Sequence, residues 1–114
     1  MKEIKAIIQP FMLTKVIEAL KQIDNMPGIT VDKEIRGYGG THTETTSHKV
    51  IDDMVEYVHK VKLEVVVPDS IVELVVSTIQ MNAHTGNPGD GKIFIYSVDD
   101  VVKIRTNERG EQAV

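Results

Sequence analysis

The sequence predicts an α/β fold of the α+β type, in which two helices cover one face of a single sheet. Two observations lead to this prediction. Four segments alternate apolar and polar side chains, which is the period of a strand, and two others repeat apolar residues at helical spacing. Their order is β-α-β-β-α-β, followed by a short strand in the tail. The 114 residues, 41% of them hydrophobic, predict one globular domain spanning residues 1–114.

The first half of the chain supplies a strand, a helix and a second strand. Residues 4–8 alternate as a strand does. Residues 13–23 carry an apolar stripe at helical spacing, and Pro27-Gly28 closes this helix. Residues 29–36 alternate again and predict the second strand.

The second half repeats this pattern. Residues 61–67 alternate and predict the third strand. Ser70 and Glu73 have the spacing of a capping box, which predicts the start of a second helix with a stripe reaching residue 79. A fourth strand is expected at residues 93–95 and a short fifth strand at residues 102–104.

This order is the split βαβ of a ferredoxin-like fold with one extra C-terminal strand. Because the helices cover one face of the sheet, the other face receives a mixed set of side chains: Lys60, Lys62, Glu64, Lys92, Phe94 and Tyr96. This face is too charged for a core and too apolar in parts for free solvation. We therefore expect it to meet another subunit.

The segment with the clearest chemistry is residues 85–92, which we call the glycine loop. It holds three glycines, Pro88 and Asp90 before Lys92. Backbone N–H groups of such a loop can approach an anion closely because no Cβ intervenes, and the lysine adds positive charge. Residues 86–92 fit most of a Walker A motif, but Ile93 stands where Mg²⁺ needs a hydroxyl. A phosphate-binding loop of another kind and a plain helix-to-strand turn both stay open.

Residues 37–57 form the second unusual segment, since about twenty residues without a period are rare in so small a domain.

The composition argues against several other classes of protein. There is no cysteine for disulfides or thiolate sites, and the net charge of −4 argues against broad nucleic-acid binding. No signal peptide or membrane-spanning run is visible, so we expect a cytoplasmic protein that is not embedded in a membrane.

Several segments together resemble the PII signal-transduction family, the trimeric nucleotide sensors of nitrogen metabolism. The resemblance is carried by residues 6–11, 37–39, 60–67, 85–94 and 103–110, and it extends over nearly the whole chain. It implies a homotrimer with an adenine nucleotide (ATP, ADP or AMP) in each cleft between neighbouring subunits. It also implies a long T-loop over residues 37–57, which would dock a target protein such as a membrane transporter or a metabolic enzyme.

The resemblance also assigns residues to the nucleotide. The phosphate loop is matched by Gly89, Asp90, Gly91 and Lys92, and Thr85 and Gly86 just before it are further candidates for binding the nucleotide. Gly37, Tyr38 and Gly39 match the base of the T-loop, and Glu64 and Val66 lie on the strand that flanks the adenine. Lys103 and Arg105 match the basic pair that a neighbouring subunit directs at the phosphates. On a strand these two side chains project to one side, so their charges would converge.

The T-loop departs from the family. Thr41 stands where 2-oxoglutarate sensors have a Mg²⁺-binding glutamine, although Lys60 matches the lysine that pairs with the oxoacid. Asp53 stands in place of the uridylylated tyrosine, and Ile51 in place of a serine that is phosphorylated in some relatives. We therefore expect an atypical member with little ATP-dependent 2-oxoglutarate binding and no covalent switch.

The same loop carries histidines and carboxylates, of which His42, Glu44 and His48 are candidate ligands for a transition metal. Whether they bind a metal, and whether Mg²⁺ accompanies the nucleotide, stays open. The alternatives to a nucleotide sensor are a trimeric divalent-cation-responsive protein of the same fold and a small phosphate-ester hydrolase. No catalytic triad or acid–base carboxylate pair stands out, so the sequence favours a sensor that is not an enzyme.

Overall fold

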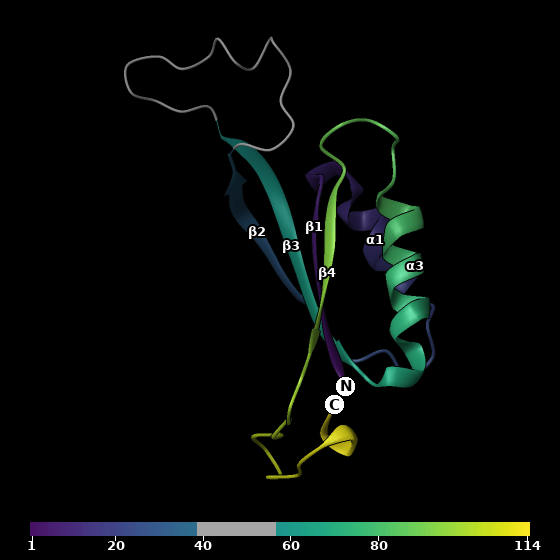
Figure 1. Cartoon of the computed structure of the whole chain (residues 1–114), viewed down its shortest axis with the longest axis vertical. Coiled ribbons are helices and arrows are strands. Elements are labelled where there is room, and N and C mark those ends of the chain that lie inside the picture. The colour runs from purple at the N-terminus through teal and green to yellow at the C-terminus, as the bar shows by residue number, and fades with distance from the viewer. Residues whose placement is uncertain (39–56) are drawn as a thin grey trace.

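The computed structural model of the protein describes residues 1–38 and 57–114 (Figure 1). Its strands are β1 (Lys2–Ile8), β2 (Thr30–Gly37), β3 (Val58–Val67) and β4 (Gly91–Ser97). Its helices are α1 (Leu13–Leu20) and α3 (Val72–Ala83), with 3-10 turns at Pro10–Met12, Asp69–Ile71 and Glu111–Ala113. The strands form one sheet in the order β2-β3-β1-β4, and each neighbouring pair is antiparallel. This arrangement confirms the split βαβ prediction.

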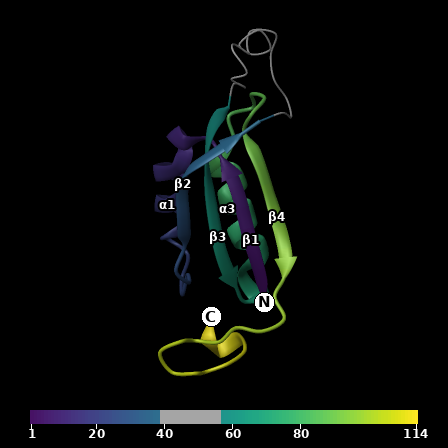
Figure 2. The ribbon, with the colours of Figure 1, turned by 90° about the vertical axis from the view of Figure 1, so that its left-hand side faces the viewer.

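Both helices pack on the same face of the sheet, and Figure 2 looks onto the opposite face. The core lies between the two layers because the alternate side chains of β1 and β3 point towards the helices. Its fully buried members include Ile4 and Ile8 of β1, Leu63 of β3, Leu20 of α1 and Ile79 of α3. The predicted apolar stripes therefore form the core.

The boundaries of α1 differ slightly from the prediction. The helix ends at Leu20, although the apolar stripe continues to Ile23. Residues 21–23 continue as a turn, in which the Ile23 N–H donates to the Leu20 carbonyl at 3.1 Å. Asn25 then adopts a left-handed φ of 59°, which stops further winding. Ile23 still packs against the core, so the stripe is used beyond the end of the helix.

The predicted capping box of α3 is wrong. Ser70 lies inside the 3-10 turn Asp69–Ile71, and α3 begins at Val72 without a side-chain cap. The turn replaces the cap, because the Ile71 N–H donates to the Pro68 carbonyl at 3.1 Å and the Val72 N–H donates to the Asp69 carbonyl. Backbone carbonyls therefore satisfy the first N–H groups of this segment, whereas a capping box would have placed the Ser70 hydroxyl on the Glu73 N–H.

The predicted fifth strand is also wrong. Val102 makes only an isolated bridge to Arg109, and residues 104–106 form a turn. The Thr106 and Asn107 N–H groups donate to the Lys103 carbonyl at 3.3 and 2.7 Å, and Asn107 has a left-handed φ of 61°. An ion pair between Arg109 and Asp100 at 3.2 Å links the two ends of this tail segment. Local hydrogen bonds have replaced the ladder that a strand would need.

The face of the sheet away from the helices has the mixed character that the sequence predicts. We call it the outer face. Lys5 lies opposite both Glu64 and Phe94, and Ile7 lies opposite Lys62 and Lys92. The Lys5 ammonium sits 5.4 Å from the ring centre of Phe94 and 5.1 Å from that of Tyr96. In the described part of the chain, no helix is long and apolar enough to cross a membrane.

Candidate nucleotide site

The glycine loop joins the end of α3 to the start of β4, and a single carboxylate organises its turn. The Asp90 carboxylate accepts hydrogen bonds from the Thr85 N–H at 2.8 Å, the Gly86 N–H at 2.9 Å and the Thr85 hydroxyl. These bonds hold the pKa of Asp90 below its ordinary value, with the Thr85 hydroxyl as the main cause. Asp90 therefore shapes the loop from within, and its oxygens are already occupied.

The backbone of this loop requires glycine at particular positions. Gly86, Gly89 and Gly91 have φ values of 90°, 96° and 103°, which side chains of L-residues rarely tolerate. At Gly91 there is also no room, because a Cβ would lie 1.7 Å from the carbonyl oxygen of Ile7. With any residue other than glycine at position 91, the loop could not approach the end of β1 this closely.

Lys60 of β3 reaches the same loop. Its ammonium donates to the Gly89 carbonyl, and partial burial lowers the pKa of Lys60 although the charge of Asp90 acts in the opposite direction. Gly37, at the end of β2, lies alongside the Lys60 stem, since a Cβ there would be 3.8 Å from the Lys60 Cγ. Because Gly91 also contacts the end of β1, the segments β1, β2, β3 and the glycine loop meet at one end of the sheet.

Gln9 belongs to this group and was missed in the sequence. Its amide nitrogen lies 3.3 Å from the position of a Cβ on Gly89. The signal for it was indirect: Gln9 directly follows β1, and Ile8 at the end of β1 pairs with Gly91. Only the antiparallel register of β1 and β4 brings this glutamine to the glycine loop.

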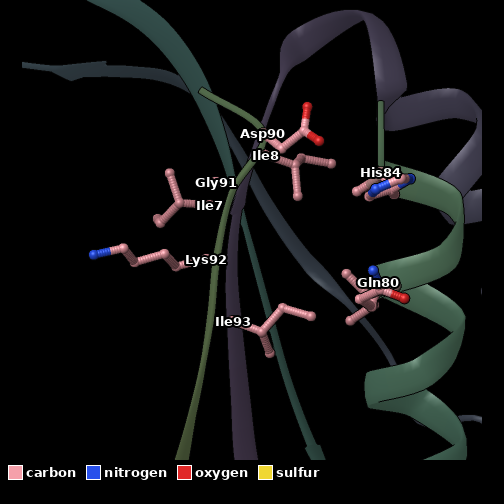
Figure 3. A pocket seen from close by; sticks show the side chains of 10 residues that line it. Ile7, Ile8, Gln80, His84, Asp90, Gly91, Lys92 and Ile93 are labelled. Atoms are coloured by element: carbon pink, nitrogen blue, oxygen red, sulfur yellow. The ribbon is translucent and has the colours of Figure 1, made fainter. Parts of the chain in front are cut away.

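A cleft of about 290 Å³ lies between α3 and the start of β4. Figure 3 shows Gln80 and His84 on the α3 side and Asp90 at the edge, while Lys92 points away from the helix. The Lys92 side chain therefore lies on the outer face. Its pairing partner Ile7 lies next to Lys62 on that face, and Glu64 is one row further along.

The predicted site residues divide into two groups. Gly37, Lys60, Gly89, Asp90, Gly91 and Lys92 lie at one end of the sheet, and Glu64 and Val66 follow along the outer face of β3. Lys103 and Arg105 belong to the tail, at the end of the molecule opposite to the glycine loop (Figure 1). Within one protomer, Lys103 and Arg105 therefore lie far from the glycine loop. Because Arg105 lies in a turn, the expected convergence of the two side chains along a strand is wrong.

The base of the T-loop is described only in part. Tyr38 is 69% exposed and makes an edge-to-face contact with Tyr57, with 5.9 Å between ring centres. Gly39, Thr41, Ile51 and Asp53 and the metal candidates His42, Glu44 and His48 all lie outside the described residues. Residues 1–38 and 57–114 contain no group of three histidines or carboxylates that could hold a metal.

Together, the fold and the loop define a class of protein: a ferredoxin-like α+β protomer with a glycine-rich loop and two lysines at one end of its sheet. The family described as Nitrogen regulatory protein P-II matches residues 1–108, and the chain belongs to this family.

Similar proteins support this assignment over the full length. The chain is 46% identical to a nitrogen regulatory protein P-II of Azospirillum brasilense and 45% identical to nitrogen regulatory protein P-II 1 of Escherichia coli K12. Both matches cover 100% of each chain. Among solved structures, Arabidopsis thaliana PII bound to citrate is similar, with a TM-score of 0.80 and 40% identity. That match covers 99% of this chain and 91% of the other.

Proposed function

We propose that the protein is a cytoplasmic signal-transduction regulator that senses adenine nucleotides in clefts between the subunits of a homotrimer. The observation that carries this proposal is the glycine loop, whose three left-handed glycines expose backbone next to Lys60 and Lys92. A nucleotide would extend from this loop along the outer face, with its phosphates at residues 89–92 and its base near Glu64 and Val66. Lys103 and Arg105 of a neighbouring copy would complete the phosphate site.

The regulatory character follows from family membership, because the relatives are named as regulatory proteins. The chemistry of the loop agrees with binding and no turnover. Its acid, Asp90, is engaged by Thr85 and Gly86, so it is not free to act as a general base. Equilibrium binding of ATP with little hydrolysis is therefore expected, whereas fast hydrolysis of a phosphate ester would favour an enzyme.

Calorimetric titration of ATP, ADP and AMP tests the nucleotide site. Each charge-assisted contact to a phosphate contributes about 1.5–3 kcal/mol. Lys92→Ala and Arg105→Ala should therefore each weaken ATP binding by about tenfold or more, since 1.4 kcal/mol corresponds to a factor of ten. Lys15→Ala is the matched control, because Lys15 is an exposed lysine on α1. Unchanged affinity in both site variants would refute the placement of the phosphates.

The output is proposed to pass through the T-loop, residues 37–57, to a transporter or a metabolic enzyme. Gly37 provides the link, because it closes β2 beside Lys60, and Lys60 bonds to the glycine loop. A ligand at the glycine loop would thus change the base of the T-loop. Hydrogen exchange of residues 37–57 should differ with and without ATP, and identical exchange would contradict this output.

The response to 2-oxoglutarate is proposed to be weak. Mg²⁺ needs a nearly complete shell of oxygen ligands, and Thr41 offers only a short hydroxyl at the relevant position. Lys60 alone would give weak binding that the metal does not assist. Titration of 2-oxoglutarate into the protein with Mg²⁺ and ATP should show little affinity, and tight binding that depends on both would overturn this expectation.

A further inference from the structure

The helical layer covers the sheet unevenly, and β2 is the strand that it leaves partly open. Val31 of β2 pairs with Leu63 of β3, so the two side chains lie in one row on the same face of the sheet. Leu63 is 1% exposed, whereas Val31 is 38% exposed. The helix α1 ends at Leu20, and residues 21–29 form turns and irregular chain. The helical layer therefore ends before it covers this row at the edge of the sheet.

The uncovered surface forms a groove of about 610 Å³ between α1, the turn that follows it and the start of β2. This volume lies within the range of about 300–1,000 Å³ that small-molecule sites occupy. The groove is separate from the candidate nucleotide site, because β2 and β4 are opposite edges of the sheet. Its apolar walls are Leu13 and Ile17 of α1, Ile23 and Met26 of the turn, and Ile29 and Val31 around the start of β2. All of these except Val31 also pack against the buried core, so the walls are held in place.

The polar groups of the groove favour one kind of ligand. Among the described residues that line it, Lys21 alone carries a charge, and Asn25 adds an amide. The Lys21 ammonium lies 3.6 Å from Glu18 Oε1, but the two side chains are 63% and 62% exposed, so this ion pair is weak and open to exchange. A cation and an N–H donor beside an apolar groove suit a ligand with an apolar body and an anionic end.

We propose that this groove binds an amphipathic carboxylate of the fatty-acid type, with its alkyl chain against the apolar walls and its carboxylate on Lys21 and Asn25. The alkyl chain supplies most of the affinity, because each methylene group removed from water contributes about as much as an exposed ion pair. The carboxylate supplies the selectivity, because Lys21 exchanges its contact with Glu18 for one with the ligand. A neutral molecule of the same length gains nothing from this exchange.

Octanoate and 1-octanol are suitable probes, because they share the length of the alkyl chain and differ in charge. Each is titrated into the full-length protein below its micelle concentration, while nuclear magnetic resonance follows the methyl groups of Met26 and Ile17. Octanoate should shift both resonances with one dissociation constant and leave Ile95 unmoved, an isoleucine of β4 that is 47% exposed and lies outside the groove. Butyrate, which lacks four of the methylene groups, should bind more weakly by at least about tenfold.

Three variants examine the carboxylate end of the site. Lys21→Gln should weaken octanoate binding by about threefold to fivefold, as the loss of an exposed ion pair would, and leave 1-octanol unchanged. Glu18→Gln should strengthen octanoate binding by about twofold, because Lys21 then has no competing partner at this position. Lys15→Gln is the matched control, since Lys15 is exposed on the same helix and does not line the groove.

A fourth variant examines the apolar wall. Val31→Asp places a carboxylate inside the groove, so octanoate binding should weaken by at least about tenfold. Leu74→Asp adds the same charge at an exposed position of α3 outside the groove and should have no effect on octanoate. Circular dichroism of both variants checks that the fold is intact.

Met26 and Ile17 resonances that stay unmoved with octanoate would overturn the proposal, whether the groove is closed by a neighbouring copy or covered by another protein. Equal affinity for octanoate and 1-octanol in the parent and in Lys21→Gln would also overturn it, because Lys21 would then not recognise the carboxylate. So would a shift of Ile95 in parallel with Met26, since octanoate would then adhere to any exposed apolar side chain.

Discussion

At the glycine loop, the carboxylate of one residue, Asp90, holds the turn together by accepting three hydrogen bonds. Asp90 binds the N–H groups of Thr85 and Gly86 and the hydroxyl of Thr85. The family resemblance suggested Asp90 as part of a nucleotide-binding loop, and the geometry explains how an acid can belong to an anion site. Its charge is engaged by its own loop, so it organises the backbone that would face the phosphates.

The pH dependence of this loop follows from the lowered pKa of Asp90. A carboxyl group with a lowered folded-state pKa stabilises the fold above its unfolded-state pKa, and this contribution is lost as the pH falls through the folded-state value. We expect the amide resonances of Thr85 and Gly86 to titrate together below the ordinary aspartate pKa of 3.8. Nuclear magnetic resonance over this acid range measures the change, and Asp90→Asn should abolish it. Titration above 3.8 would contradict the prediction.

Gly91 is the residue at which the loop is least able to accept change. Gly91→Ala would combine a φ of 103° with a Cβ only 1.7 Å from the Ile7 oxygen. Strain and overpacking each cost about 1–3 kcal/mol, so we expect a loss of several kcal/mol or failure to fold. Gly28→Ala is the control, because a Cβ there has no neighbour within 4 Å. Denaturant unfolding at one protein concentration measures both, and equal stability of the two variants would refute the contact.

At the scale of elements, β3 connects the core to the candidate site. Its alternate residues Val61, Leu63, Val65 and Val67 are buried against the helices, while Lys60, Lys62, Glu64 and Val66 face outwards. One strand therefore supplies both a wall of the core and the row of side chains along which a nucleotide would lie. A shift of its register by one residue would exchange the two sets.

The core role of β3 gives a stability prediction. Leu63 is 1% exposed, so Leu63→Ala should lower the free energy of unfolding by about 2–5 kcal/mol through lost burial and a residual cavity. Leu74→Ala is a matched control, because Leu74 lies on α3 with 51% of its surface exposed. Its expected effect is within about 0.5 kcal/mol. Similar losses in both variants would show that Leu63 is not a core residue in solution.

At the scale of the whole molecule, no helix within residues 1–38 and 57–114 covers the outer face. Phe94 and Tyr96 remain 40% and 42% exposed, side by side with charged residues of β1 and β3. Such a surface combines aromatic rings with charged groups, among which Lys62 pairs with Glu64 and Lys5 lies over the two rings. These are features of a subunit interface, and the proposed trimer would bury this face and bring Lys103 and Arg105 to a neighbour.

The trimer can be tested without damaging the protomer. Phe94→Asp removes an aromatic ring from the outer face and places a carboxylate opposite Lys5, where the single chain should tolerate it. We expect the parent protein to sediment as a trimer at micromolar concentration and this variant to dissociate. Leu74→Asp, on the helical side, should leave the trimer intact. A parent protein that sediments as a stable monomer would rule out the proposed assembly.

The order of the elements and most of the core could be predicted from the sequence because periodicity reports burial directly. Residues that alternate along β1 and β3, or recur at helical spacing in α3, have one way to bury their apolar side chains together. The glycines of residues 85–92 likewise predicted a loop with left-handed backbone, which Gly86, Gly89 and Gly91 adopt, because this freedom is a property of the single residue. The binding of an anion by this loop stays a prediction.

The tertiary structure alone decided which residues meet. The predicted capping box and fifth strand are wrong because the chain forms local turns there, in which the Pro68 and Lys103 carbonyls accept hydrogen bonds from nearby N–H groups. The contact of Lys60 with Gly89, the approach of Gln9 to Gly89 and the pairing of Lys5 with both Glu64 and Phe94 depend on the register of β1 with its neighbours. Local patterns fix how each segment folds, whereas contacts between distant segments depend on how the strands are aligned, which no short stretch of sequence encodes.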